Sequence, residues 1–253
     1  MILMIGMLAL CSGCKSPGSD KPIGSIVEIK APLGLPPVPI PPDNPPTAET
    51  IALGRRLFYD TRLSRDNSVS CASCHNPKYD FTDGMSLSKG MGGQTGVRNS
   101  PTVMNAAYLP FQFWDGRSIS LEQQAGSPMA NPVEMDQAHD VSVSKLEADP
   151  EYRDMFVKAF GPGTITISQV EKSLASFERT LLSGNSTFDR YEFGGDKKAL
   201  TPSQIRGLAI FRDPHKGNCA ACHTISEKYA LFTDGKFHNI GEGVGDDGTF
   251  SDV

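Results

Sequence analysis

The chain has 253 residues, of which 38% are hydrophobic, and its 24 Lys and Arg against 29 Asp and Glu give a net charge of −5. This apolar fraction can build a hydrophobic core without disulfide bonds, which argues against a disordered chain and against a small disulfide-stapled domain. The negative charge and the lack of a long basic run in the sequence argue against a nucleic-acid partner.

Residues 1–14 form an apolar segment that ends in a first cysteine pair, Cys11 and Cys14. The apolar run is shorter than the roughly 20 residues that a membrane-spanning helix needs, so we interpret it as an export signal. Ser12-Gly13 before Cys14 resemble the lipobox of bacterial lipoproteins, in which the cysteine is acylated. We therefore expect a lipid tether at Cys14; ordinary signal cleavage, giving a soluble periplasmic protein, is the alternative.

Residues 15–46 are expected to be a linker or arm, because half of the 16 residues from 31 to 46 are proline. Proline fixes φ and has no amide donor, so this stretch should be extended. It is either a semi-rigid spacer or an arm packed on its own domain.

The sequence after residue 46 predicts helices and shows little sign of strands. Capping residues followed by apolar spacing predict four helices, which begin at Thr47, at Asp149-Pro150, at a Ser168–Glu171 capping box and at Thr201-Pro202. A helix therefore precedes each of the two remaining cysteine pairs by a similar distance, which suggests a duplicated unit. Residues 83–117 are rich in glycine and lack a clean period, so we expect a functional loop there.

The two remaining pairs read Cys71-Ala-Ser-Cys74-His75 and Cys219-Ala-Ala-Cys222-His223. CxxCH is the attachment pattern of c-type haem, because two thiols about one helical turn apart meet the two vinyl groups and the histidine ligates the iron. A zinc site, a thiol–disulfide motif and plain disulfides are the alternatives. Paired zinc CxxC units usually lie about 15–20 residues apart, much closer than these, and no βαβ pattern surrounds either motif. We therefore predict two covalent haem c groups and, since bacteria attach this haem outside the cytoplasm, a periplasmic protein.

The chain resembles the bacterial di-haem cytochrome c peroxidases and the related MauG-like enzymes from about Leu35 onward. The resemblance is carried, in order, by LGRRLFYDTRLS, CASCHNP, RNSPTVMNAAY, FWDGR, NPVEM, CAACH and FTDGKFHNIG. It implies a mainly α fold with two cytochrome-c-like haem domains, residues 47–195 and 196–253. The family's second domain continues beyond FHNIG and supplies a methionine ligand, whereas no Met follows Met155 here, so we expect the C-terminal domain to be truncated.

The resemblance also implies roles for single residues. The haem held by Cys71, Cys74 and His75 would be peroxidatic, and the haem held by Cys219, Cys222 and His223 would transfer electrons. The other implied roles are a distal acid–base glutamate at Glu134, a distal-pocket glutamine at Gln124, a tryptophan between the haems at Trp114 and a calcium ligand at Asn99. The acid–base role has an independent reason, since cleavage of a peroxide needs a group that moves a proton between its two oxygens. A partly desolvated carboxylate can do this.

The sequence departs from the family pattern in the loop before RNSPT. Well-studied members carry a histidine there that caps the peroxidatic iron in the resting enzyme, and by spacing that position is Met91. Either Met91 binds the iron weakly or the iron is five-coordinate. A thioether ligand raises the potential of haem iron, which does not suit a peroxidatic haem, so we favour the open iron.

Together these features predict an enzyme that reduces hydrogen peroxide to water. Its electrons would come from a small redox protein, a cytochrome c or cupredoxin, through the His223 haem and past Trp114 to the His75 haem. The alternatives are a MauG-like oxidase acting on a partner protein and a di-haem electron-transfer cytochrome without peroxidase activity. The resemblance is also compatible with a homodimer.

Overall fold

The computed structural model describes residues 19–239, so the predicted signal and Cys14 lie outside the described residues. Within that range the chain forms helices and isolated β-bridges but no strand, which confirms the mainly α fold class. The α-helices are α1 (Ala48–Tyr59), α2 (Cys71–Cys74), α3 (Leu121–Ala130), α4 (His139–Ala148), α5 (Pro150–Phe160), α6 (Ile167–Glu178), α7 (Thr187–Glu192) and α8 (Pro202–Arg212). None of these described helices is long and apolar enough to cross a membrane.

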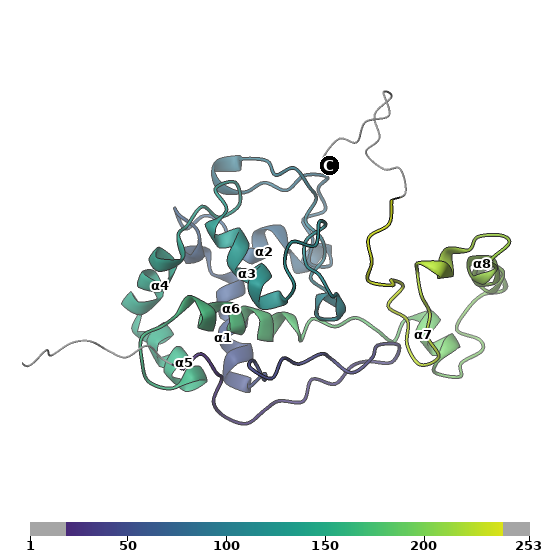
Figure 1. Cartoon of the computed structure of the whole chain (residues 1–253), viewed down its shortest axis with the longest axis horizontal. Coiled ribbons are helices and arrows are strands. Elements are labelled where there is room, and N and C mark those ends of the chain that lie inside the picture. The colour runs from purple at the N-terminus through teal and green to yellow at the C-terminus, as the bar shows by residue number, and fades with distance from the viewer. Residues whose placement is uncertain (1–18, 240–253) are drawn as a thin grey trace, which may run out of the picture.

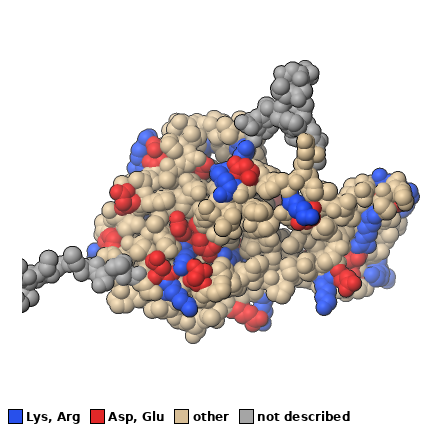
Figure 2. Space-filling model, viewed as in Figure 1, with Lys and Arg blue, Asp and Glu red and all other residues tan. Residues whose placement is uncertain are grey.

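The helices lie in two groups, α1 to α6 in a larger lobe and α7 and α8 in a smaller one (Figure 1). Aromatic rings hold the smaller lobe together, since Phe232 lies 5.0 Å from Phe188 of α7 and 6.0 Å from Phe211 of α8, measured between ring centroids. Helix α7 therefore packs with the C-terminal segment. On the face that Figure 2 shows, acidic and basic side chains are interspersed rather than gathered by sign.

The core of the larger lobe is the crossing of α1 and α6. Leu53, Leu57 and Phe58 of α1 are fully buried, and the Phe58 ring packs edge-on against Phe177 of α6 at 5.3 Å. The two backbones approach closely because Gly54 has no side chain, and a Cβ there would overlap the carbonyl oxygen of Ser173. This crossing fixes the α1 end that leads into the first CxxCH motif.

Helix α6 begins two residues earlier than the Ser168–Glu171 capping box predicts, so that prediction is wrong. Thr166 is the N-cap, and its hydroxyl accepts a hydrogen bond from the Gln169 amide at 3.2 Å. Glu171 is instead packed against α3, where Gly126 leaves room for its carboxylate. The predicted caps at Thr47, Asp149 and Thr201 are the observed ones.

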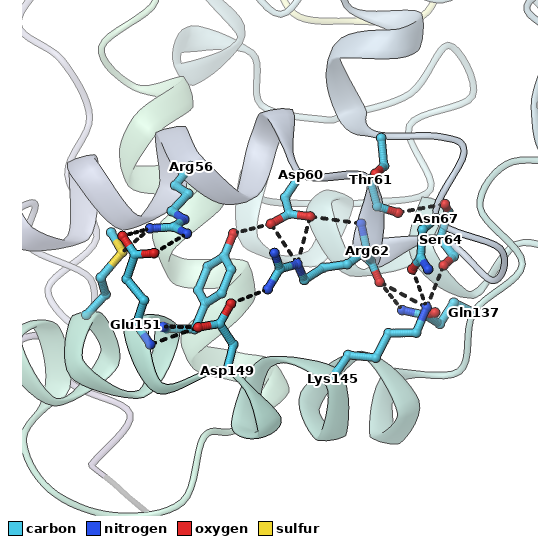
Figure 3. A network of polar contacts seen from close by, with 12 residues as sticks. Arg56, Asp60, Thr61, Arg62, Ser64, Asn67, Gln137, Lys145, Asp149 and Glu151 are labelled. Carbon is cyan, nitrogen blue, oxygen red and sulfur yellow. Dashed lines mark hydrogen bonds and ion pairs between the residues drawn. The ribbon is translucent and has the colours of Figure 1, made fainter.

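A polar network joins the end of α1 to α4 and α5 (Figure 3). The Lys145 ammonium donates to the carbonyl of Ser64 at 2.8 Å and to Asn67 Oδ1 at 2.8 Å. Arg62 pairs with Asp149 at 2.5 Å, and Gln137 donates to the Arg62 carbonyl at 2.9 Å. The network thereby links the loop after α1 to the segment that carries the NPVEM motif.

The proline-rich segment is an arm packed on both lobes. The carbonyl of Leu33 accepts from the Asn185 amide at 2.7 Å, and that of Gly34 accepts from the Ala230 amide at 3.1 Å. The carbonyl of Pro36 accepts from the Tyr108 hydroxyl at 2.9 Å. The arm therefore runs along the junction of the two lobes, as its path in Figure 1 shows.

Candidate functional site

A cavity of about 1200 Å³ lies against the larger lobe, between α2, α3, the C-terminal end of α6 and the 88–117 loop, and α7 and residues 230–233 of the smaller lobe complete its wall. It is larger than most small-molecule pockets, which measure about 300–1,000 Å³. Its lining includes seven residues that the sequence singles out: Cys71, Cys74, His75, Asn99, Trp114, Gln124 and Glu134. The fold therefore brings the first CxxCH motif together with the three residues expected to do chemistry beside it.

The His75 imidazole is held by its Nδ1 atom. Nδ1 lies 3.2 Å from the carbonyl oxygen of Phe81, to which it can donate, and 3.2 Å from Ser100 Oγ. Both contacts use Nδ1, which leaves Nε2 for a metal, and a histidine ligand is usually oriented in this way. Burial lowers the pKa of His75, so its ring is neutral, as ligation requires.

The second motif repeats this arrangement at the surface of the smaller lobe. His223 Nδ1 lies 2.9 Å from the carbonyl oxygen of Phe232. Phe81 and Phe232 both have a left-handed backbone, with φ of 60° and 53°. The two histidines can thus donate the same kind of hydrogen bond to a backbone carbonyl.

A further sequence signal accompanies this repeat, although the predicted duplicated unit did not include it. Each of the two phenylalanines begins the same tetrapeptide, Phe-Thr-Asp-Gly, at residues 81–84 and 232–235. A ring from the preceding helix also lies near each histidine, Phe58 at 6.4 Å from His75 and Phe211 at 6.3 Å from His223. The duplicated unit therefore comprises a helix with an inward phenylalanine, the CxxCH motif and the FTDG turn.

The four cysteines in the described range are free. Burial raises the pKa of the Cys71 thiol to about 12 and that of Cys74 to about 11, which disfavours the thiolate that zinc binding or thiol exchange requires. No group of three or more His, Cys, Asp or Glu side chains within residues 19–239 is arranged to hold a metal ion. Two neutral thiols and a neutral imidazole on the wall of a large cavity fit covalent haem better than zinc.

Glu134 is a half-buried carboxylic acid on the cavity wall. Asn131 Nδ2 donates to Glu134 Oε1 at 2.8 Å, and the Asn131 carbonyl accepts from the Glu134, Met135 and Asp136 amides at 3.1, 3.2 and 2.9 Å. Burial raises the pKa of Glu134, while the positive charge of Arg117 and the Asn131 hydrogen bond oppose that rise. The carboxyl group of Glu134 is therefore held in one orientation, and its pKa is raised less than burial alone would raise it.

Met91 does not line this cavity, although its loop supports Glu134. The Met91 side chain is fully buried. Its amide donates to the carbonyls of Val133 and Glu134, at 3.2 and 2.9 Å. The neighbouring Gly90 lies so close to this backbone that a Cβ would overlap the Val133 carbonyl oxygen. The 88–96 loop is therefore docked on the acid-bearing segment through its backbone.

Trp114 and Asn99 form one contact at the edge of the cavity. The indole of Trp114 is 57% exposed, and its N–H donates to the Asn99 carbonyl at 2.9 Å. The Asn99 side-chain amide donates to the Met85 carbonyl at 3.0 Å. Beside Trp114, Phe237 of the C-terminal segment packs on Phe111 at 5.9 Å, so the loop that carries Trp114 meets that segment.

Three residues of the site are not among those predicted from the sequence: Arg117, Asn131 and Glu178. Arg117 and Asn131 lie in the motifs FWDGR and NPVEM. Asn131 reaches Glu134 within its own motif, whereas the closeness of Arg117 to Glu134 depends on the fold. Glu178 follows Leu174 by four residues and precedes Leu181 by three, so helical spacing places it on the apolar face of α6, and this spacing is the signal that could have marked it.

Comparisons with known proteins agree with this site. Residues 48–198 match the family model of di-haem cytochrome c peroxidases. The methylamine utilization protein MauG of Methylorubrum extorquens is 42% identical over 239 residues, which cover 94% of this chain and 66% of that protein. Cytochrome c peroxidase Ccp of Escherichia coli is 40% identical over 186 residues, 73% of this chain and 39% of that protein.

Solved structures give the same result. A MauG-like protein associated with microbial copper homeostasis aligns with a TM-score of 0.70 at 31% identity, covering 82% of this chain and 61% of that one. The diheme peroxidase BthA from Burkholderia thailandensis aligns with a TM-score of 0.66 at 26% identity, covering 88% and 62%. In all four pairings the chain spans less than two thirds of the relative's length.

Proposed function

The chain belongs to the di-haem cytochrome c peroxidase family, and from this we propose that it reduces hydrogen peroxide to water with electrons from a small redox protein, a cytochrome c or a cupredoxin. One observation carries the proposal. Glu134, a carboxylic acid with a raised pKa, shares one cavity with the cysteines and histidine of the first CxxCH motif. A cavity built only for electron transfer would not need an oriented acid on its wall.

The residues that would hold the cofactor are those of the two motifs. Cys71 and Cys74 would form thioether bonds and His75 would ligate iron through Nε2, and Cys219, Cys222 and His223 would do the same in the smaller lobe. Haem c at the first site would supply the iron that exchanges electrons with the peroxide oxygens. The domains we propose are residues 47–195 around the first motif and 196–253 around the second, with α7 packed on the latter.

Glu134 performs the proton transfer in this proposal. Its Oε2 atom takes the proton of the first peroxide oxygen and gives it to the departing one, which then leaves as water. Asn131 keeps the carboxyl group in place through Oε1. The positive charge of Arg117 opposes the rise in the pKa of Glu134 and so favours the ionised base. Gln124, on the same cavity wall, supplies a hydrogen bond to the bound peroxide.

The electron route we propose passes through the junction of the lobes. Phe232 holds His223 through its carbonyl and also lines the cavity, and Trp114 lines it beside the contact with Phe237. Electrons would enter at the His223 site and reach the His75 site past Trp114.

We further propose that the iron at His75 has no protein ligand on its distal side. The burial of Met91 away from the cavity wall supports this interpretation. The protein would act in the periplasm, where c-type haem is attached, with Cys14 as its lipid attachment point. Calcium bound near Asn99 and a homodimer are further parts of the proposal that follow from family membership.

A MauG-like oxidation of a partner protein is the second candidate function, because the similar relative from Methylorubrum extorquens is named MauG. An electron-transfer cytochrome is the third candidate. Mixing with peroxide in the presence of a reduced cytochrome c or cupredoxin separates the three. Continuous oxidation of the donor supports the peroxidase, a long-lived oxidised species without donor turnover supports the MauG-like oxidase, and no spectral change supports the cytochrome.

Glu134→Gln tests the residue that carries the proposal. We expect the rate of the peroxide reaction to fall by roughly 10² or more, because the amide cannot accept the proton. Glu49→Gln, an exposed acid at the start of α1, is the control and should keep the original rate. An unchanged rate in Glu134→Gln would exclude the acid–base role.

A further inference from the structure

Glu178, the last residue of α6, is a second carboxylic acid on the wall of the same cavity. Glu178 is 5% exposed. Within residues 19–239, no group forms a hydrogen bond with its Oε2 atom. Leaving a buried polar atom without a partner is energetically costly, so such atoms in native proteins usually face a ligand or water. The proposed peroxide chemistry makes no use of this residue.

The neighbouring charges do not neutralise Glu178. Arg179 follows it in sequence, but its guanidinium forms a bidentate pair with Glu122 of α3, at 2.7 and 3.1 Å. Glu178 also lies at the C-terminal end of α6, where the helix dipole disfavours a negative charge. Burial raises the pKa of Glu178 to about 8, Glu122 adds to the rise, and Arg179 opposes it.

Several helices contribute side chains near Glu178. Helix α2 contributes the neutral thiol of Cys71 and α3 contributes Glu122, while α1 packs the rings of Phe58 and Tyr59 on the neighbouring Phe177. The other titratable or charged residues that line the cavity are Cys74, His75, Arg98, Tyr108, Asp115, Arg117, Glu134 and Asp189. No hydrogen bond or ion pair to Glu178 Oε2 comes from any of these described residues.

We propose that Glu178 carries a proton into the haem cavity and donates a hydrogen bond from Oε2 to its contents, so that its ionisation is linked to reduction of the haem at Cys71 and Cys74. The inference rests on the proposed haem site. When one electron arrives from the donor, ionised Glu178 takes up one proton from solvent, and the charge of the cavity stays constant. Reduction of peroxide to two waters consumes two protons with two electrons. Glu178 meets this requirement by taking up a proton with the first electron, passing it to the reacting oxygen, and taking up a second proton with the second electron.

The test is the pH dependence of the midpoint potentials of both haems in the haem-loaded protein, measured without peroxide. We expect one of the two potentials to fall as pH rises between about pH 7 and 9, around the pKa of Glu178, and the other to serve as an internal reference. Glu178→Gln should remove this pH dependence while both haems remain attached. Glu171→Gln is the matched control, because Glu171 is another acid of α6 with a pKa raised by burial but does not line the haem cavity.

An infrared measurement on the unmodified protein keeps the proposal falsifiable if Glu178→Gln fails to fold. Reduction should produce a protonated-carboxyl C=O band that shifts in deuterium oxide. Two potentials that are independent of pH over this range, or a pH dependence retained in Glu178→Gln, would overturn the proposal. Neither result depends on the peroxide reaction, so the role of Glu134 stands or falls separately.

Discussion

The electrostatics of single residues on the cavity wall decide which pH range suits the chemistry. Glu134 acts as a base only when ionised, and burial raises its pKa above the ordinary value of a glutamate. The ionised fraction therefore falls as pH decreases through this raised pKa, and the peroxide reaction should slow with it. Arg117 and the Asn131 hydrogen bond set how far the pKa rises.

Arg117→Met should move this acidic limb of the pH–rate profile to higher pH. The reason is that removal of the guanidinium removes a positive charge that favours the carboxylate. Arg117→Lys keeps the charge and should leave the limb close to its original place. The measurement is the rate of the peroxide reaction against pH in the three proteins. A limb that stays in place or moves to lower pH in Arg117→Met would show that Arg117 does not act on Glu134.

At the scale of elements, two close backbone approaches fix the site. Gly90 brings the 88–96 loop against the segment that carries Glu134, and Gly54 brings α1 against α6. Neither contact depends on a polar side chain, so each should be sensitive to a single added methyl group.

Gly90→Ala should slow the peroxide reaction by roughly 10-fold to 100-fold, because a displaced loop moves Glu134 from its position. Attachment of haem should be unaffected, since Cys71, Cys74 and His75 lie on another element. Gly96→Ala is the control in the same loop, where a Cβ would meet atoms only at 3.8 Å or beyond. Equal rates in the two variants would show that the loop does not position Glu134.

Gly54→Ala should lower the free energy of unfolding by about 1–3 kcal/mol or more, because α1 and α6 must separate to admit the methyl group. Gly207 of α8 gives the comparison, since it precedes Phe211 as Gly54 precedes Phe58 but has nothing within 4 Å of an added Cβ. Gly207→Ala should raise stability by about 0.5–1 kcal/mol through helix propensity. Thermal unfolding of the haem-loaded variants measures both changes in stability. Similar melting temperatures for Gly54→Ala and Gly207→Ala would contradict the packing described for α1 and α6.

These elements also show what the sequence could predict. Thr47, Asp149 and Thr201 were identifiable as helix starts because a cap is a local interaction. The start of α6 was misplaced because Thr166 with Gln169 and Ser168 with Glu171 both fit a capping box, and the packing of Glu171 on Gly126 decides between them. Glu134, Gln124 and Trp114 could be expected at the cavity from motifs, and helical spacing could have marked Glu178, whereas the docking of Met91 depends on contacts between distant segments.

At the scale of the whole molecule, the two lobes contain the same unit of helix, CxxCH motif and FTDG turn, but they bury its histidine to different extents. His75 lies on the wall of a large cavity and is half-buried, while His223 is exposed among the described residues. The proline-rich arm and the 230–237 segment connect the two units through the hydrogen bonds of Leu33, Gly34 and Pro36. The unit with the cavity would do the peroxide chemistry, and the exposed unit would meet the electron donor.

The proposed enzyme holds two haems covalently through separate motifs. Extraction with acidic acetone should therefore leave both haems on the protein. A double variant in which Ser replaces both Cys71 and Cys74 should lose one haem, and one in which Ser replaces both Cys219 and Cys222 should lose the other. The mass of each protein measures the loss. Complete extraction of haem, or a loss of both haems from either double variant, would contradict two independent attachment sites.

The central claim is that a distally open haem shares its cavity with Glu134, and a single measurement tests it most directly. The fully oxidised protein is mixed with hydrogen peroxide in a stopped-flow spectrometer, with no reductant added. We expect a high-spin ferric signal before mixing, which is lost as the protein reacts with peroxide. A wholly low-spin oxidised spectrum that does not change on mixing would contradict the claim.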